Sequence, residues 1–255
     1  MILKLKNYFD EKACQDKASM SILNRLLAES RVNVNQEITL KGYGLTRLTA
    51  LHKAMIRYGS NNPRMANVIK AFIANERFDV NQKGEFGRRC ELIHTLVQKE
   101  GAQALRILKD IVNLPGIDPN VPDQYGNTPL HYIILKCLLQ SYGSLSVLLN
   151  NSKVQLNQKN EHGHIPFDYL FFLATRDLSG MDSSSSLEEK RIAIEAIKAF
   201  LRQGRFIVNN KQAMLNTLNS SDISLECRID RIKALYSIPN PRRIPDGINR
   251  FCSHY

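Results

Sequence analysis

The fold is decided by residues 123–131, which read Asp123-Gln124-Tyr125-Gly126-Asn127-Thr128-Pro129-Leu130-His131. Gly126 supplies the positive φ that a tight turn needs directly before a helix. The Thr128 hydroxyl can cap that helix, and Pro129 suits its first position, where no backbone N–H is needed. Leu130 points inward, and His131 lies within the first turn. The stretch therefore predicts a tight turn that opens into a packed helix.

A second marker recurs five times along the chain and indicates where repeats end. Its pattern is an apolar residue, a polar residue, an apolar residue or proline, and then asparagine. Each copy follows apolar residues at helical spacing, such as Ile194/Ile197/Phe200/Leu201. We therefore expect each copy to end the second helix of a two-helix repeat. The copies superpose without gaps and are Arg31-Val-Asn-Val-Asn35, Arg77-Phe-Asp-Val-Asn81, Gly116-Ile-Asp-Pro-Asn120, Lys153-Val-Gln-Leu-Asn157 and Arg205-Phe-Ile-Val-Asn209.

The first marker also recurs, as Thr49-Ala-Leu-His52, Glu91-Leu-Ile-His94, Thr128-Pro-Leu-His131 and Ile165-Pro-Phe-Asp168. These residues resemble the signature turn of the ankyrin-repeat family, which carries a Thr-Pro-Leu-His motif. The resemblance covers about residues 20–210. It implies an all-α fold, an ankyrin-repeat solenoid of stacked helix-turn-helix units with long inter-helix loops and terminal capping helices. It also implies structural roles for His52, His94 and His131, which would bond the turn backbone between neighbouring repeats, alongside Thr128, Pro129 and Leu130.

The register of the markers predicts the boundaries of the units. We expect an N-terminal capping repeat at 1–36, repeats at 37–82, 83–121, 122–158 and 159–210, capping helices at 211–238 and a Pro/Arg tail at 239–255. The repeats exceed the usual period, so extra residues should lie between their two helices. Residues 58–63 read as one such loop, and the serine-rich residues 177–186 read as a longer, mobile one.

Composition narrows the class of protein. Five scattered cysteines without a Cys-x-x-Cys pair favour a reduced, cytoplasmic location. No apolar run is long enough to span a membrane, and no apolar leader follows Met1. The net charge is +11, with 13 basic against 7 acidic residues in positions 1–82. Such a charge favours an acidic protein, an anionic surface or nucleic acid as partner.

Candidates for chemistry are few. Cys90 and His94 are four residues apart and could form a nucleophile–base pair, but His94 belongs to the repeat marker and a Cys/His pair alone is weak. His162 and His164 lack accompanying ligands at metal-binding spacing. We therefore expect a protein that is not an enzyme, with no cofactor, no metal and no small-molecule substrate.

The leading interpretation is a monomeric protein–protein interaction module. Long loops and Asn-rich repeat ends are similar, more weakly, to ankyrin-repeat effectors that intracellular bacteria secrete into host cells by type IV secretion. The alternatives are a basic nucleic-acid or anionic-surface binding protein and an effector with a hidden Cys/His site. Two sets of residues are expected to bind an acidic protein partner. The aromatic turn tips are Tyr43, Phe86, Tyr125 and His162, and the basic row is Arg57, Lys99 and Lys136 with Arg47, Arg88 and Arg89 beside it.

Overall fold

The computed structural model describes residues 17–35, 37–40, 46–49, 63–79, 81, 92–97, 102–114, 116–137, 142–175 and 183–239. Several expected site residues lie outside these ranges. They are Tyr43, His52, Arg57, Phe86, Arg88, Arg89, Cys90 and Lys99. The backbones of Arg47 and Lys136 are described, but their side chains are not.

The described part of the chain is all-α apart from one short hairpin. Strand β1 (Glu37–Leu40) pairs antiparallel with β2 (Thr46–Thr49), with Glu37 opposite Thr49. The sequence had placed Arg47 on a turn and Thr49 at the start of a helix, and both lie instead in β2. In β1, Glu37 and Thr39 alternate with Ile38 and Leu40, which gives the two-residue period of a strand. In β2, Leu48 lies opposite Ile38 of β1.

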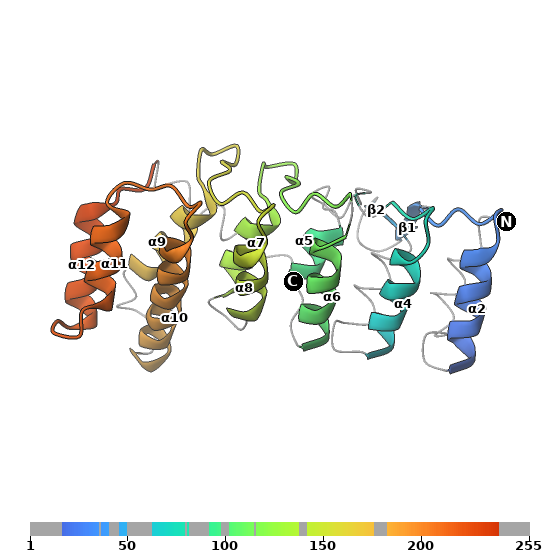
Figure 1. Cartoon of the computed structure of the whole chain (residues 1–255), viewed down its shortest axis with the longest axis horizontal. Coiled ribbons are helices and arrows are strands. Elements are labelled where there is room, and N and C mark those ends of the chain that lie inside the picture. The colour runs from blue at the N-terminus through green and yellow to red at the C-terminus, as the bar shows by residue number, and fades with distance from the viewer. Residues whose placement is uncertain are drawn as a thin grey trace. The chain divides into compact units, whose positions relative to one another are not determined.

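The chain divides into two compact units, residues 1–124 and 125–255. The first contains helices α2 (Lys17–Ala28), α4 (Pro63–Ile73), α5 (Leu92–Val97) and α6 (Ala102–Val112), labelled in Figure 1. α4 packs against both α2 and α6, and α5 packs against α6. The apolar stripes predicted from helical spacing form the core here, including Leu23, Leu27, Val68, Ile69, Phe72, Leu108 and Ile111.

The second unit contains three successive helix pairs. They are α7 (Pro129–Cys137) with α8 (Tyr142–Asn150), α9 (Pro166–Thr175) with α10 (Ser183–Arg202), and α11 (Lys211–Asn219) with α12 (Leu225–Leu235). α9 packs against α7 as well as α10, and α10 packs against α8 and α11. These contacts enclose an aromatic cluster of Phe167, Phe171, Phe200, Phe206 and Tyr236.

Helix α10 corrects one expectation about loops. The run Ser183–Ser186 was assigned to a mobile loop, but it forms the first turn of α10. Serine is well tolerated in the first turn, where N–H groups lack helical partners. Part of the insertion therefore extends α10.

All five marker loops start with the same backbone hydrogen bond. The N–H of the second marker residue donates to the carbonyl three residues earlier in every copy. The pairs are Val32–Glu29 at 3.0 Å, Phe78–Asn75 at 2.9 Å, Ile117–Leu114 at 3.5 Å, Val154–Asn151 at 3.1 Å and Phe206–Gln203 at 3.1 Å. The sequence register of the marker thus corresponds to one recurring local conformation.

Candidate functional site

His131 holds the turn that contains the Thr-Pro-Leu-His motif. Its Nδ1 accepts from the Thr128 backbone N–H at 3.0 Å and lies 2.9 Å from the Thr128 hydroxyl. Because a backbone N–H can only donate, Nδ1 carries no proton and Nε2 does. Nε2–H then donates to the His164 carbonyl at 3.2 Å, in the next turn of the same unit. His131 and Leu130 are buried, so this motif faces the interior.

Asp168, like His131, accepts a hydrogen bond from the backbone N–H three residues earlier, but through a carboxylate oxygen instead of a ring nitrogen. Its Oδ2 accepts from the Ile165 N–H at 2.8 Å, the same three-residue step as in the preceding turn. Its Oδ1 accepts from the hydroxyl of Tyr236, which follows α12. Burial raises the pKa of Asp168, against the lowering effects of the Tyr236 and Ile165 hydrogen bonds. Burial and the Asp168 contact also raise the pKa of Tyr236, so its hydroxyl stays the donor.

A buried amide fixes the backbone beneath the turn tips. The Asn160 Nδ2 donates to Asn127 Oδ1 at 2.9 Å and to the Tyr169 hydroxyl at 2.8 Å. Its Oδ1 accepts from the N–H groups of His162 and His164, both at 3.0 Å. All of these polar atoms are thereby used to hold two neighbouring turns in place.

The expected aromatic tips Tyr125 and His162 are both half-buried. The Tyr125 carbonyl accepts from the Glu161 N–H at 3.0 Å, so the two tips stand on turns that touch directly. Gly126 has φ +76°, and a Cβ there would lie 2.8 Å from the Glu161 nitrogen. Glycine is therefore required both by conformation and by space.

The asparagines that end the marker loops hold the next loop through its backbone. Asn35 donates to the Arg77 carbonyl at 2.6 Å and accepts from the Asp79 N–H at 2.8 Å. Asn81 makes the equivalent contacts with Gly116 at 2.9 Å and Asp118 at 3.4 Å. In the second unit, Asn157 bonds both the carbonyl and the N–H of Ile207, at 2.7 and 3.1 Å. We refer to these contacts as the asparagine ladder.

Two arginines at the first marker position cap the preceding second helix, a role the sequence analysis missed. Arg77 donates to the carbonyls of Leu27 and Val32, the latter at 3.0 Å. Arg205 donates to the carbonyls of Leu149 and Val154, the former at 2.5 Å. Both arginines thus reach the same two register positions. The signal was available, since Arg occupies the first position in three of the five markers.

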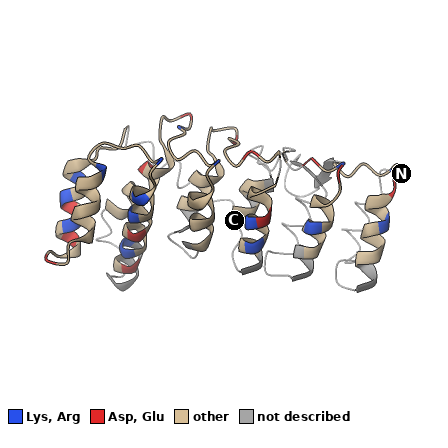
Figure 2. Cartoon of the chain, in the orientation of Figure 1, with Lys and Arg blue, Asp and Glu red and all other residues tan. Residues whose placement is uncertain are grey.

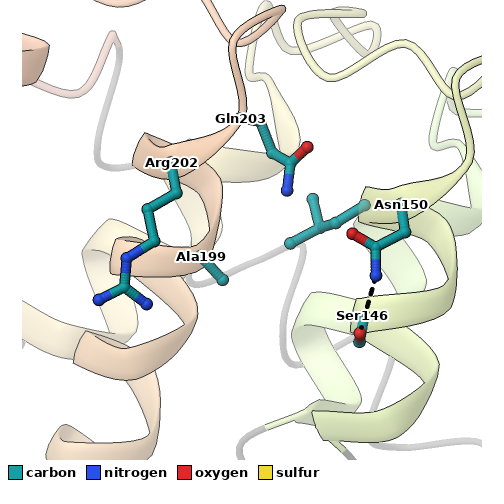
Figure 3. Close-up of a pocket in the computed structure, with 6 residues that line it drawn as sticks. Ser146, Asn150, Ala199, Arg202 and Gln203 are labelled. Carbon is teal, nitrogen blue, oxygen red and sulfur yellow. Dashed lines mark hydrogen bonds between the residues drawn. The ribbon is translucent and has the colours of Figure 1, made fainter.

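A cavity of about 200 Å³ lies between α8 and α10. It is lined by Ser146, Leu149, Asn150, Ala199, Arg202 and Gln203. Figure 3 shows the Asn150 and Gln203 amides directed into the space between the helices, whereas Arg202 extends away from α8. The Asn150 amide already donates to the Ser146 hydroxyl at 3.2 Å.

The expected basic row is described only in part. Lys136 lies in α7. The equivalent position in the next helix pair is Leu173 of α9, whose side chain is 6% exposed. At this position the register therefore places one apolar side chain in the core. Figure 2 shows lysine and arginine on α2, α4 and α6 of the first unit, where Arg25, Lys70, Arg106 and Lys109 are exposed. One of these, Lys70, lies 3.8 Å from Asp110.

The remaining candidates for chemistry are the Cys90 and His94 pair and the His162 and His164 pair. His94 is buried in α5, while Cys90 lies outside the described residues. The His162 and His164 rings are 6.5 Å apart, and no cluster of three metal-ligating side chains occurs in the part of the chain that the structure describes.

Among the described helices, none is both long enough and apolar enough to cross a membrane. Models of known protein families do not match this chain, and curated proteins show no significant match to it either.

Proposed function

We propose that this chain is a non-enzymatic ankyrin-type stack that binds a protein partner through its turn tips and adjacent helix ends. The observation that carries the proposal is the recurrence of identical contacts at identical register positions. Asparagine links loop to loop, and arginine caps the preceding helix, in the first unit and again in the second. A chain built from such equivalent units presents a row of equivalent surface positions, which suits recognition of an extended protein surface.

The turn tips are the best described part of that surface. Tyr125 and His162 stand on turns that are fixed from below by Asn160 and by the Tyr125–Glu161 backbone bond. Side chains on a preorganised backbone lose little entropy on binding, and aromatic rings supply much of the energy of interfaces. Tyr43 and Phe86 occupy the equivalent sequence positions, lie outside the described residues, and are proposed to contact the partner in the same way.

The charge of the chain favours an acidic partner. The excess of basic residues would steer an acidic surface toward the chain and accelerate association. The weaker resemblance to type IV secreted effectors makes a host-cell protein the partner class to test first.

Nucleic-acid binding stays a second candidate because of the exposed Arg25, Arg106 and Lys109. The contact of Lys70 with Asp110 reduces the local positive charge on that face. A nucleic-acid partner would show a steep loss of affinity with rising salt in a filter-binding assay.

The proposed function is tested by capturing partners from a eukaryotic lysate and then measuring the purified pair by biolayer interferometry. We expect Tyr125→Ala with His162→Ala to weaken binding at least tenfold without lowering the melting temperature. Arg57→Glu, Lys99→Glu and Lys136→Glu together should slow association at low salt, and this effect should vanish near 1 M salt, where screening acts within about 3 Å. Arg231→Glu, an exposed reversal on α12, is the matched control. Equal affinity of all variants, or catalytic turnover by the chain, would contradict the proposal.

A further inference from the structure

The asparagine ladder ends at Asn209 in the part of the chain that the structure describes. Asn209 occupies the same marker position as Asn35, Asn81 and Asn157, and its side chain is exposed. Within residues 125–137, 142–175 and 183–239 of its unit, no hydrogen bond holds this amide. Asn35, Asn81 and Asn157 each bond one carbonyl and one N–H. Asn209 therefore presents a carboxamide of a kind that binds backbone elsewhere in the same chain.

The loop that carries Asn209 is held in place by its neighbours. The Phe206 N–H bonds the Gln203 carbonyl, as in every other marker loop, and Asn157 bonds Ile207 on both backbone groups. On the other side, the Asn210 amide donates to the Leu235 carbonyl at 3.0 Å. A ligand at Asn209 would therefore meet a preorganised loop and lose little free energy in ordering it.

Ile207 distinguishes this loop from the other four. The third marker residue is polar in the earlier copies, namely Asn33, Asp79, Asp118 and Gln155. Ile207 takes that place in the last copy and is 79% exposed, the most exposed of the large apolar side chains in the described residues. An apolar side chain thus appears in the last of the five marker loops, beside an asparagine whose amide has no hydrogen bond within the described residues of its unit.

We propose that Asn209 and Ile207 form a docking edge for an extended peptide segment of the protein partner. The inference rests on the proposed partner-binding function. The Asn209 amide would donate to one backbone carbonyl of the segment and accept from its N–H two residues further on, as Asn35 does with Arg77 and Asp79. Ile207 would bury an apolar side chain of the same segment.

A second copy of this chain does not fit as the occupant. α11 packs against α10, and α12 packs against α11, so the helical layer beside α10 is already filled. A second copy would need to place its own α2 in that space if its Arg31–Asn35 loop were to reach Asn209. A single extended segment needs room only at the level of the loops.

The test uses a capped peptide that copies residues 75–81, because this backbone is the one that Asn35 holds. The full-length ¹⁵N-labelled protein is titrated with the peptide, and the side-chain amide signals that Asn209→Ala removes are followed by NMR. We expect a saturable shift of these signals, with millimolar affinity. Asn209→Ala, or a peptide methylated on the backbone nitrogen of the residue copied from Asp79, should each bind about tenfold more weakly because hydrogen bonds are lost. Ile207→Ser should also weaken binding.

Asn219→Ala, an exposed asparagine at the end of α11, is the matched control and should bind the peptide like the unchanged protein. No shift at millimolar peptide, or equal affinity for Asn209→Ala, would overturn the docking edge. The proposed function fails separately. If a captured partner binds Asn209→Ala and the unchanged chain equally well, partner binding stands and the docking edge falls. If the peptide docks at Asn209 but no partner is found, the docking edge stands and the proposed partner binding falls.

Discussion

Replacing Asn157 by alanine should destabilise the second unit by an amount that its two hydrogen bonds define. Asn157 donates to the Ile207 carbonyl at 2.7 Å and accepts from the Ile207 N–H at 3.1 Å. A hydrogen bond contributes about 0.5–1.5 kcal/mol net. Because Ile207 is exposed, water replaces the lost partner, and no penalty for buried unpaired groups is added. We therefore expect a loss of about 1–3 kcal/mol in the free energy of unfolding.

The assay is thermal unfolding of the full chain followed by far-ultraviolet circular dichroism. A loss of this size should lower the melting temperature by about 2–12 °C for a chain of this length. Asn209→Ala is the matched control, since it removes the same side chain from the same marker position without a hydrogen bond in the described part of its unit. It should change the melting temperature by less than about 1 °C. If both variants melted alike, the ladder would contribute nothing to stability and our reasoning would be refuted.

Three further predictions concern other contacts of the second unit. Arg205→Lys should lower the free energy of unfolding by about 1–2 kcal/mol in urea titrations, because lysine cannot reach the Leu149 and Val154 carbonyls together; an unchanged midpoint would contradict the capping role. Leu130→Ala should cost about 2–5 kcal/mol, since Leu130 is 1% exposed, and a melt identical to that of the parent would argue against its burial. Burial raises the pKa of Asp168 above its ordinary value of 3.8, so its contribution to stability is fully present below about pH 3.8 and is lost as the pH rises through the raised pKa. Asp168→Asn should remove this slope while keeping the bond from Ile165, and parallel stability–pH curves for the two proteins would exclude Asp168 as its source.

The spacing of the markers predicted where each loop lies, but not which bonds the asparagine makes. Asparagine at the fifth marker position was visible as a pattern in the sequence. Its partners are 35 to 50 residues away in the chain, in the next marker loop, and follow only once the loops are placed side by side. The sequence also does not show which carbonyls Arg77 and Arg205 bond. Their long side chains reach the ends of α2 and α8, which lie earlier in the chain.

Asp168 shows why a departure from a motif is hard to interpret from sequence alone. Asp168 stands where the other three copies of the first marker carry histidine. In the structure, Oδ2 of Asp168 and Nδ1 of His131 accept from the same kind of N–H, three residues earlier. The second oxygen of Asp168 is used by Tyr236, 68 residues later, and no local pattern announces that partner.

The closing helices were predicted well in position and less well in their ends. Within residues 211–238, where capping helices were expected, the structure has α11 (Lys211–Asn219) and α12 (Leu225–Leu235). The second helix begins at Leu225, because the Ser224 hydroxyl accepts from the Cys227 N–H and fixes the start there. Local capping chemistry thus decided a boundary that apolar periodicity alone left open.

Gly126 determines how closely two neighbouring turns approach each other, because it has no Cβ atom. With the Tyr125 carbonyl bonded to the Glu161 N–H, the two backbones meet with no side chain between them. Any methyl group at residue 126 would act as a wedge 2.8 Å from the Glu161 nitrogen. Gly116 and Gly163 also have positive φ, but a Cβ at either would meet nothing within 4 Å. The short separation of these two turns therefore depends on the absence of a Cβ atom at residue 126.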